Sequence, residues 1–133
     1  MRAVLMAAGM GRRLASASGG IAKALVEANG RALIIHQIHC LRAAGFRDEQ
    51  LVIVGGFEYE RLAPLVMNEA PESTLCHNTE YHHQNLLSLL SARDYLDQGF
   101  LLINVDHLMP PSVHIRMLQE DAPVVACVES GRE

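Results

Sequence analysis

Two glycines and two arginines follow the first apolar run of the sequence, in the stretch MAAGMGRRL at residues 6–14. Backbone N–H groups beside glycine can approach phosphate oxygens without hindrance from a side chain, and arginine adds a forked positive charge. The spacing does not match the dinucleotide-binding fingerprint, because Leu14 stands where a third small residue is needed. It does not match a P-loop either, because the Gly-Lys-Ser/Thr ending of that motif is absent. The stretch therefore predicts another kind of phosphate-binding loop. Its candidate residues are Ala7, Ala8, Gly9, Met10, Gly11, Arg12 and Arg13.

Lys23 is the only lysine in the chain. Arginine supplies all the other permanent side-chain cations, which indicates that a compact point charge is needed at this one position. A cation placed shortly after a phosphate-binding loop is suited to neutralising phosphate. The alternative that composition leaves open is a solvated loop lysine without a chemical role.

Asp106 directly follows the apolar run LLINV at residues 101–105. The aspartate is therefore expected at the carboxyl end of a buried strand, on the ligand side of the sheet. Mg²⁺ prefers oxygen ligands, so a carboxylate at this place can join the ion to phosphates. A simple turn ahead of Pro110 and Pro111 is the alternative.

A third polar cluster is the stretch HNTEYHHQN at residues 77–85, in which Asn78, Tyr81 and Asn85 supply two amides and a phenol. Such groups can hydrogen-bond the edge of a nucleobase or the polar head of a substrate. The stretch also contains three histidines. Zinc is disfavoured, because adjacent histidines point apart and no spaced Cys or His pair completes a ligand set.

Apolar runs alternate with helical patterns along the chain. The expected strands are residues 3–6, 51–56, 73–76, 100–105 and 123–129. The expected helices are residues 33–41, ended by Gly45, residues 58–68, which contain Pro64, and residues 86–96, with Asn85 as N-cap. Apolar strands separated by helices of about three turns predict an α/β fold. We expect a mainly parallel, Rossmann-like sheet in three layers, with helices on both faces.

The chain has 133 residues, of which half are hydrophobic, and this is enough for one ordinary core and one domain. A net charge of -4 without a basic stripe excludes the usual nucleic-acid binders. No apolar run approaches the roughly 20 residues of a membrane helix, and no signal peptide is recognisable. Cys40, Cys76 and Cys127 lack disulfide-like spacing, which favours reduced thiols and a cytoplasmic protein.

The order of these features resembles the nucleotidyltransferases that activate sugar phosphates and related phosphate monoesters. The similarity runs over nearly the whole chain, from AAGMGRRL through KALVEANGRALIIHQIHCLRAAGF and LVIVGGF to the strand that ends in Asp106. Within that superfamily, NTEYHHQNLLSLLSARDYL and the Asp106–His107 pair are more similar to cytidylyltransferases acting on phosphocholine, inositol phosphate or phosphonates than to the hexose enzymes.

The resemblance implies that an acceptor phosphate oxygen attacks the α-phosphorus of an NTP, CTP in the cytidylyltransferases, and that pyrophosphate leaves. It implies that the backbone of Ala8, Gly9 and Gly11 contacts the base and the phosphates. Arg13 would bind the β and γ phosphates, and Lys23 would neutralise the α-phosphate and the attacking phosphate. These two side chains are the expected catalytic residues.

The same resemblance implies that Asp106 holds a Mg²⁺ cofactor. We assign Asn78 and Asn85 to the nucleotide site, and Tyr81 to the site of the small phosphate or phosphonate substrate. The sequence departs from the family pattern at Arg12, where Ser or Thr is usual, and before Lys23, where proline is usual.

Members of this family are typically much longer, and their second half supplies further strands, most of the acceptor pocket and a second metal-binding aspartate. Residues 1–133 are therefore expected to be the N-terminal, nucleotide-binding part of such a domain. An unpaired strand edge at residues 124–129 would favour a homo-oligomer, with Glu129 or Glu133 of a neighbouring copy as a second carboxylate. The alternative to an enzyme is a nucleotide-binding remnant or partner subunit without turnover.

Overall fold

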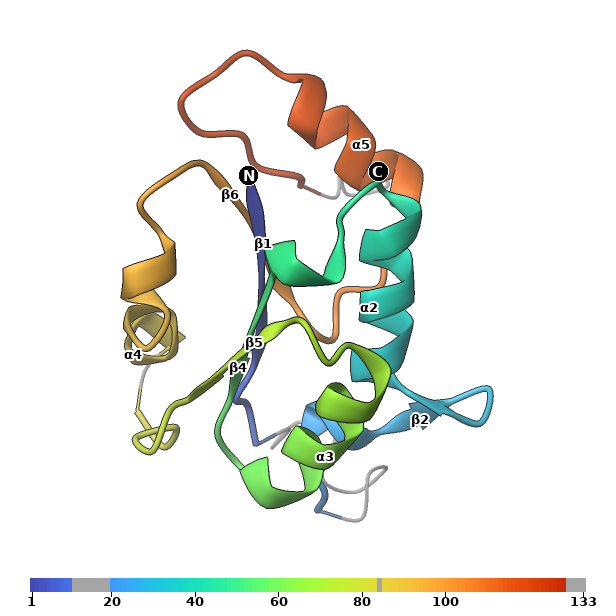
Figure 1. Cartoon of the computed structure of the whole chain (residues 1–133), viewed down its shortest axis with the longest axis vertical. Helices are drawn as coiled ribbons and strands as arrows, with labels where there is room; N and C mark the ends of the chain where they lie inside the picture. Colours follow the sequence, from blue (N-terminus) through green and yellow to red (C-terminus); the bar gives the residue numbers. More distant parts are fainter. Residues whose placement is uncertain (11–19, 84, 129–133) are drawn as a thin grey trace, which may run out of the picture.

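A parallel four-stranded sheet forms the centre of the protein (Figure 1). The computed structural model describes residues 1–10, 20–83 and 85–128. The sheet has the order β5-β4-β1-β6, and each neighbouring pair is parallel. The strands are β1 (Arg2–Ala7), β4 (Leu51–Gly55), β5 (Thr74–His77) and β6 (Phe100–Asn104). The predicted mainly parallel α/β sheet is confirmed, and four of the five expected strands lie within a residue or two of their expected places.

The larger core lies on the side of the sheet covered by α2 (Leu33–Ala43), α3 (Tyr59–Glu69) and α5 (Pro111–Gln119). Apolar side chains of α2 recur at helical spacing and are buried against the strands, as the sequence predicts. Gly45 has a φ of 102°, a left-handed conformation that ends the helix at low cost. Pro64 lies inside α3 and does not divide it.

A short hairpin connects the 3-10 turn η2 (Lys23–Leu25) to α2, and the sequence analysis missed it. Its strands are β2 (Glu27–Ala28) and β3 (Arg31–Ala32). The two residues between them, Asn29 and Gly30, have φ values of 53° and 73°. An Asn-Gly pair with two positive φ angles is a strong signal for a tight hairpin.

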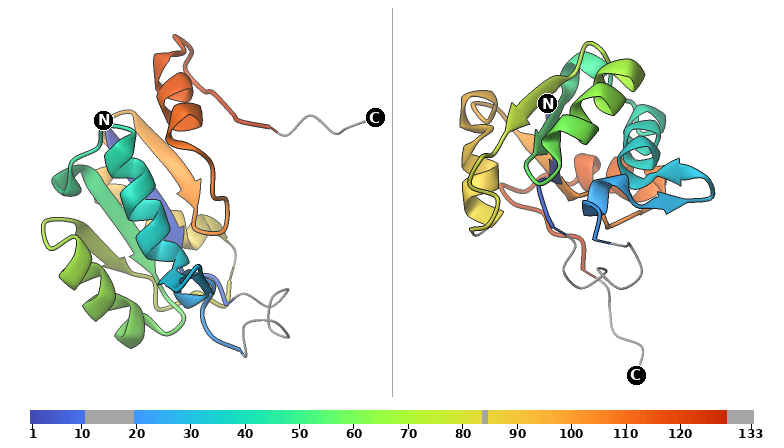
Figure 2. Two further views of the ribbon diagram at one scale, coloured as in Figure 1. Left: turned by 90° about the vertical axis from the view of Figure 1, so that its right-hand side faces the viewer. Right: turned by 90° about the horizontal axis from the view of Figure 1, so that it is seen from below.

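The opposite side of the sheet has a thinner cover, formed by α4 (Asn85–Leu90) and the 3-10 turn η4 (Arg93–Tyr95), as the view from below shows (Figure 2, right). The expected helix over residues 86–96 is therefore shorter than predicted and begins one residue earlier. The small cover packs on β4 and β1 but leaves Phe100 and Leu102 of β6 exposed. Helices thus lie on both faces, and β6 is covered on one of them.

The prediction of a strand at residues 123–129 is wrong for residues 123–128, the part of this segment that the structure describes. This segment leaves α5 and runs out to one side of the molecule (Figure 2, left). Val124 and Val128 are 86% and 82% exposed. The described partner of β6 is β1, and residues 123–128 do not pair with β6. An apolar segment that lacks a hydrogen-bonded neighbouring strand does not form a strand. The free edge expected at residues 124–129 belongs instead to β6, where the described sheet ends on that side.

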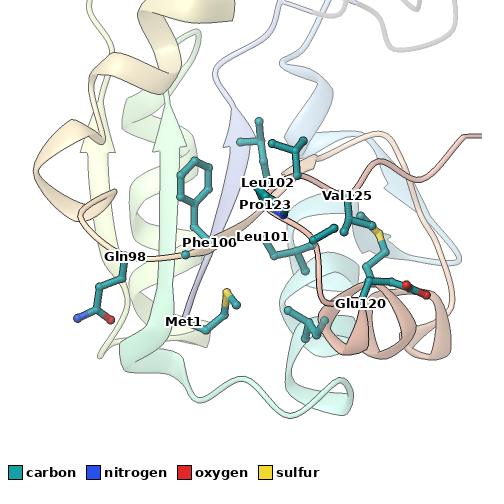
Figure 3. Close-up of a pocket in the computed structure, with 13 residues that line it drawn as sticks. Met1, Gln98, Phe100, Leu101, Leu102, Glu120, Pro123 and Val125 are labelled. Carbon is teal, nitrogen blue, oxygen red and sulfur yellow. The ribbon is translucent and has the colours of Figure 1, made fainter.

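An apolar groove of roughly 530 Å³ lies between the beginning of β6 and this segment (Figure 3). Met1, Phe100 and Leu102 line one part of it, and Pro123 and Val125 line another. The groove is at the amino end of β6, away from the strand ends where ligands bind in such sheets.

None of the helices that the structure describes has the length and apolar character of a membrane span. Glu129 and Glu133 lie outside the described residues, and self-association stays a prediction.

Candidate functional site

The carboxyl ends of the four parallel strands meet at one edge of the sheet (Figure 1). Ala8 follows β1, Gly56 follows β4, Asn78 follows β5, and the connection after β6 carries Asp106. Open α/β sheets bind ligands at this edge. Four segments that are far apart in the sequence therefore form one candidate site.

Lys23 and Asp106 are in direct contact at this edge. The Lys23 Nζ atom lies 2.9 Å from Asp106 Oδ2, and the two side chains are 27% and 31% exposed. Burial raises the pKa of the Asp106 carboxyl, but the hydrogen bond and charge of Lys23, followed by a bond from the Asp106 backbone and the nearby His107, together hold that pKa below its ordinary value. The site thus presents an ionised carboxylate and an ammonium group side by side, and Lys23 is not a freely solvated loop side chain.

The backbone just before Lys23 is held by Glu58, a residue that the sequence analysis did not single out. The Ala22 N–H donates to Glu58 Oε2 at 2.6 Å, and Arg61 donates to Glu58 Oε1 at 2.9 Å. The bond from Ala22 lowers the pKa of Glu58, burial opposes this, and Arg61 lowers it further. Glu58 has a φ of 54°, which is uncommon for a residue with a side chain and is often found at functional sites.

The part of the glycine loop that the structure describes is Ala7 to Met10. Ala8 is buried, whereas Gly9 is exposed. A Cβ atom added at Gly9 would meet no described atom within 4 Å, and the φ of Gly9 is not positive. Among the described residues, nothing packs so closely that glycine is required here, nor does the backbone conformation require it, so the position leaves room for close approach of a ligand. The predicted roles of Gly11, Arg12 and Arg13 fall outside the described residues.

Gly56 shows the opposite behaviour, and its role was missed because the Gly-Gly pair looked only like a strand end. A Cβ atom at Gly56 would lie 2.7 Å from Tyr81 Cβ and 2.9 Å from Ala8 Cβ. The loops after β1 and β5 are also joined to this region by backbone hydrogen bonds, from Phe57 to Ala8 and from Asn78 to Gly55. Gly56 therefore allows three strand ends to pack closely.

Asn78, Tyr81 and Asn85 do not all present their polar groups to the site. Asn78 is 4% exposed, its Nδ2 donates to Ser88 Oγ at 2.8 Å, and its Oδ1 accepts from the Glu80 N–H at 2.9 Å. In this state its amide therefore anchors the loop to α4. The Tyr81 ring packs beside the rings of Phe57 and His82. Asn85 begins α4, and its side chain lies outside the described part, so the assigned roles stay predictions.

The sequence profile of the MobA-like NTP transferase domain matches residues 3–133. The chain belongs to this family. The predicted nucleotidyltransferase resemblance and fold type are confirmed. The lysine and the aspartate that meet where the parallel strands end both lie within the matched residues.

The relatives of this MobA-like domain include cytidylyltransferases. The chain is 30% identical over 128 residues to the "Bifunctional IPC transferase and DIPP synthase" of Rubrobacter xylanophilus, covering 96% of this chain and 29% of that protein. It is 33% identical over 117 residues to the 2-aminoethylphosphonate cytidylyltransferase of Lancefieldella rimae, covering 82% and 46%. The chain thus spans less than half the length of these curated relatives.

A solved structure with the same fold is the inositol-1-phosphate CTP transferase from T. maritima. The TM-score is 0.77 at 26% identity, and the alignment covers 91% of this chain and 49% of the solved one. The two proteins therefore share a fold over nearly the whole of this chain.

Zinc and Mg²⁺ require different sets of side-chain ligands from the MobA-like domain. Among the described residues, no three His, Cys, Asp or Glu side chains are grouped as a metal site. Structural zinc needs four protein ligands, whereas Mg²⁺ keeps several waters and takes one or two carboxylates together with substrate phosphates. Asp106 offers a partly exposed carboxylate at the strand ends, which is the kind of oxygen ligand that Mg²⁺ takes, and the Mg²⁺ cofactor stays a prediction.

Proposed function

We propose that this chain is the nucleotide-binding part of a cytidylyltransferase, which transfers CMP from CTP to a small phosphate monoester or phosphonate and releases pyrophosphate. The observation that carries the proposal is the Lys23–Asp106 contact at the strand ends of an NTP transferase domain. The preference for CTP comes from the relatives, whose names specify CTP, cytidylyl transfer or a phosphonate substrate.

The reaction needs no covalent enzyme intermediate. An oxygen of the acceptor forms a bond to the α-phosphorus, the bond from that phosphorus to the bridging oxygen breaks, and pyrophosphate leaves with the electron pair. Catalysis then consists of alignment and of neutralising the charge that develops. Lys23 would contact the α-phosphate of a nucleotide that binds beside the Gly9 backbone, and its contact with Asp106 at the strand ends supports this role.

Asp106 contributes to this reaction by holding charge at a fixed place. Its carboxylate contacts Lys23, and a phosphate that entered the site would offer the lysine a second anionic partner. When bound, Mg²⁺ would supply further neutralisation of the phosphates, with Asp106 as its protein ligand.

The test is pyrophosphate release by the full-length protein, measured with the four NTPs, Mg²⁺ and a panel of phosphate monoesters and phosphonates. We expect release with CTP and one class of acceptor, and loss of release when Mg²⁺ is chelated. Binding of CTP without release for any acceptor would instead support a nucleotide-binding protein without turnover. Release with another NTP only would overturn the assignment of the base.

A further inference from the structure

Gln37 is a fully buried polar side chain on the core side of α2. It occupies a place in the apolar stripe of this helix, three residues after Ile34 and four before Leu41. A polar residue on a buried face is a signal that the sequence analysis could have used.

The side-chain nitrogen of Gln37 contacts the backbone on both sides of Asp106. Gln37 Nε2 lies 3.1 Å from the Val105 carbonyl oxygen and 2.9 Å from the His107 carbonyl oxygen. A longer contact of 3.4 Å reaches the Asn104 carbonyl. Because carbonyl oxygens only accept, the amide nitrogen of Gln37 is the atom that faces them.

The other end of this amide is not satisfied. Within the described residues, Gln37 Oε1 has no hydrogen-bond partner although it is buried. A buried acceptor without a partner is unfavourable, so the net stability that this amide supplies is small. Its main consequence is geometric, because it holds the carbonyl groups before and after Asp106.

The sheet holds the same connection from the opposite direction. The Val105 N–H donates to the Met6 carbonyl of β1 at 3.1 Å. The backbone leading into Asp106 is therefore tied both to β1 and, through Gln37, to α2. With its two neighbours held, Asp106 directs its carboxylate toward Lys23.

We propose that Gln37 is a positioning residue for the reaction: its buried amide fixes the connection after β6 so that the Asp106 carboxylate faces Lys23 and the metal that accompanies the nucleotide. This inference rests on the proposed function. Residues that orient a metal ligand without touching the metal typically change metal affinity or activity by roughly 10- to 100-fold when replaced.

Cys40 offers a matched control on the same helix. Its Sγ donates to the Met109 carbonyl at 3.0 Å, so it also ties α2 to the connection after β6. Met109 lies three residues beyond Asp106, where the backbone is no longer adjacent to the carboxylate. Loss of the Cys40 contact should therefore leave metal binding unchanged.

The experiment compares Gln37→Met, Gln37→Leu and Cys40→Ala in the full-length protein. Both replacements at residue 37 keep a side chain of comparable size and leave no hydrogen-bond donor to face the carbonyl groups. Electron paramagnetic resonance measures Mn²⁺ affinity in the presence of CTP, and thermal unfolding measures the folded fraction. We expect a loss of Mn²⁺ affinity of roughly 10- to 100-fold for both Gln37 variants and none for Cys40→Ala.

The outcomes separate this inference from the proposed function. Wild-type protein that bound no Mn²⁺ with CTP would overturn both. Wild-type binding with equal affinity in a folded Gln37 variant would overturn the role of Gln37 alone. Failure of both Gln37 variants to fold, or an equal loss in Cys40→Ala, would assign these side chains to the stability of the fold and would also overturn the positioning role.

Discussion

The two halves of the candidate site are built in different ways. In the charged half, Lys23 and Asp106 form an ion pair that is partly exposed, and Glu58 holds the backbone beside Lys23. In the packed half, Ala8 and Gly56 belong to strand ends so close together that one additional methyl group has no room. Partly exposed charges contribute little to stability but act strongly on a ligand, whereas close packing contributes to stability directly. Substitutions in the two halves should therefore affect different quantities.

The largest expected effect is on turnover, in the charged half. Lys23→Ala should lower kcat by about 100-fold or more, because a cation that stabilises developing charge is lost. The free energy of unfolding should change by no more than about 1 kcal/mol, since a partly exposed ion pair contributes little to stability. Pyrophosphate release and urea unfolding measure the two effects. Arg47→Ala removes an exposed cation elsewhere and serves as control, and equal turnover in the two variants would remove Lys23 from the mechanism.

The next effect is on stability, in the packed half. Gly56→Ala should lower the free energy of unfolding by about 1–3 kcal/mol, because the new Cβ overlaps Tyr81 and Ala8 and forces the loops apart. Gly99→Ala is the control, because its Cβ would meet only Met1 side-chain atoms at 3.5 Å and 3.7 Å. Urea unfolding of both variants gives the comparison. A Gly56→Ala protein as stable as Gly99→Ala would show that the packed half can relax.

A smaller effect concerns pH, through the carboxylate that holds the Lys23 segment. The folded-state pKa of Glu58 is lowered from 4.5, so its contribution to stability is fully present above that value. It is lost as pH falls through the lower folded-state pKa. Glu58→Gln should therefore be less stable than wild type by about 1 kcal/mol at neutral pH, where a charge-assisted hydrogen bond becomes a neutral one.

Unfolding free energies of wild type and Glu58→Gln, measured at a series of pH values from neutral to acidic, test this prediction. The two curves should converge as the pH falls below 4.5. Glu60→Gln, two residues later at the exposed start of α3, is the control and should follow wild type. Parallel curves for wild type and Glu58→Gln would mean that the Ala22 contact does not depend on charge.

The smallest effect on stability is expected at Gly9. Gly9→Ala should change the free energy of unfolding by no more than about 0.5 kcal/mol, because the new Cβ meets no described atom within 4 Å. Calorimetric titration should nevertheless show weaker CTP binding if the ligand approaches this backbone. Unchanged affinity together with unchanged stability would remove Gly9 from the nucleotide site.

Local pattern was sufficient for most of the architecture. The strands β1, β4 and β6 were predicted because each is a short, continuous apolar run, and the helix α2 was predicted because its apolar residues recur at helical spacing. Both patterns depend only on residues that are near one another in the sequence. The same reasoning placed Asp106 at a strand end and identified Lys23 as an unusual cation. It failed at residues 123–128, because an apolar segment becomes a strand only when another strand is available to pair with it.

The sequence by itself determined which residues carry side chains suited to binding phosphate or metal, and the order in which the strands and helices follow one another. Only the tertiary structure decided that Lys23 contacts Asp106, 83 residues away, and that Glu58 and Gln37 hold the backbone beside them. It also decided that residue 56 must be small, whereas a Cβ atom at residue 9 would meet no described atom within 4 Å. The physical reason is that strand order and helix packing set distances between distant segments, and no periodicity within one segment contains that information.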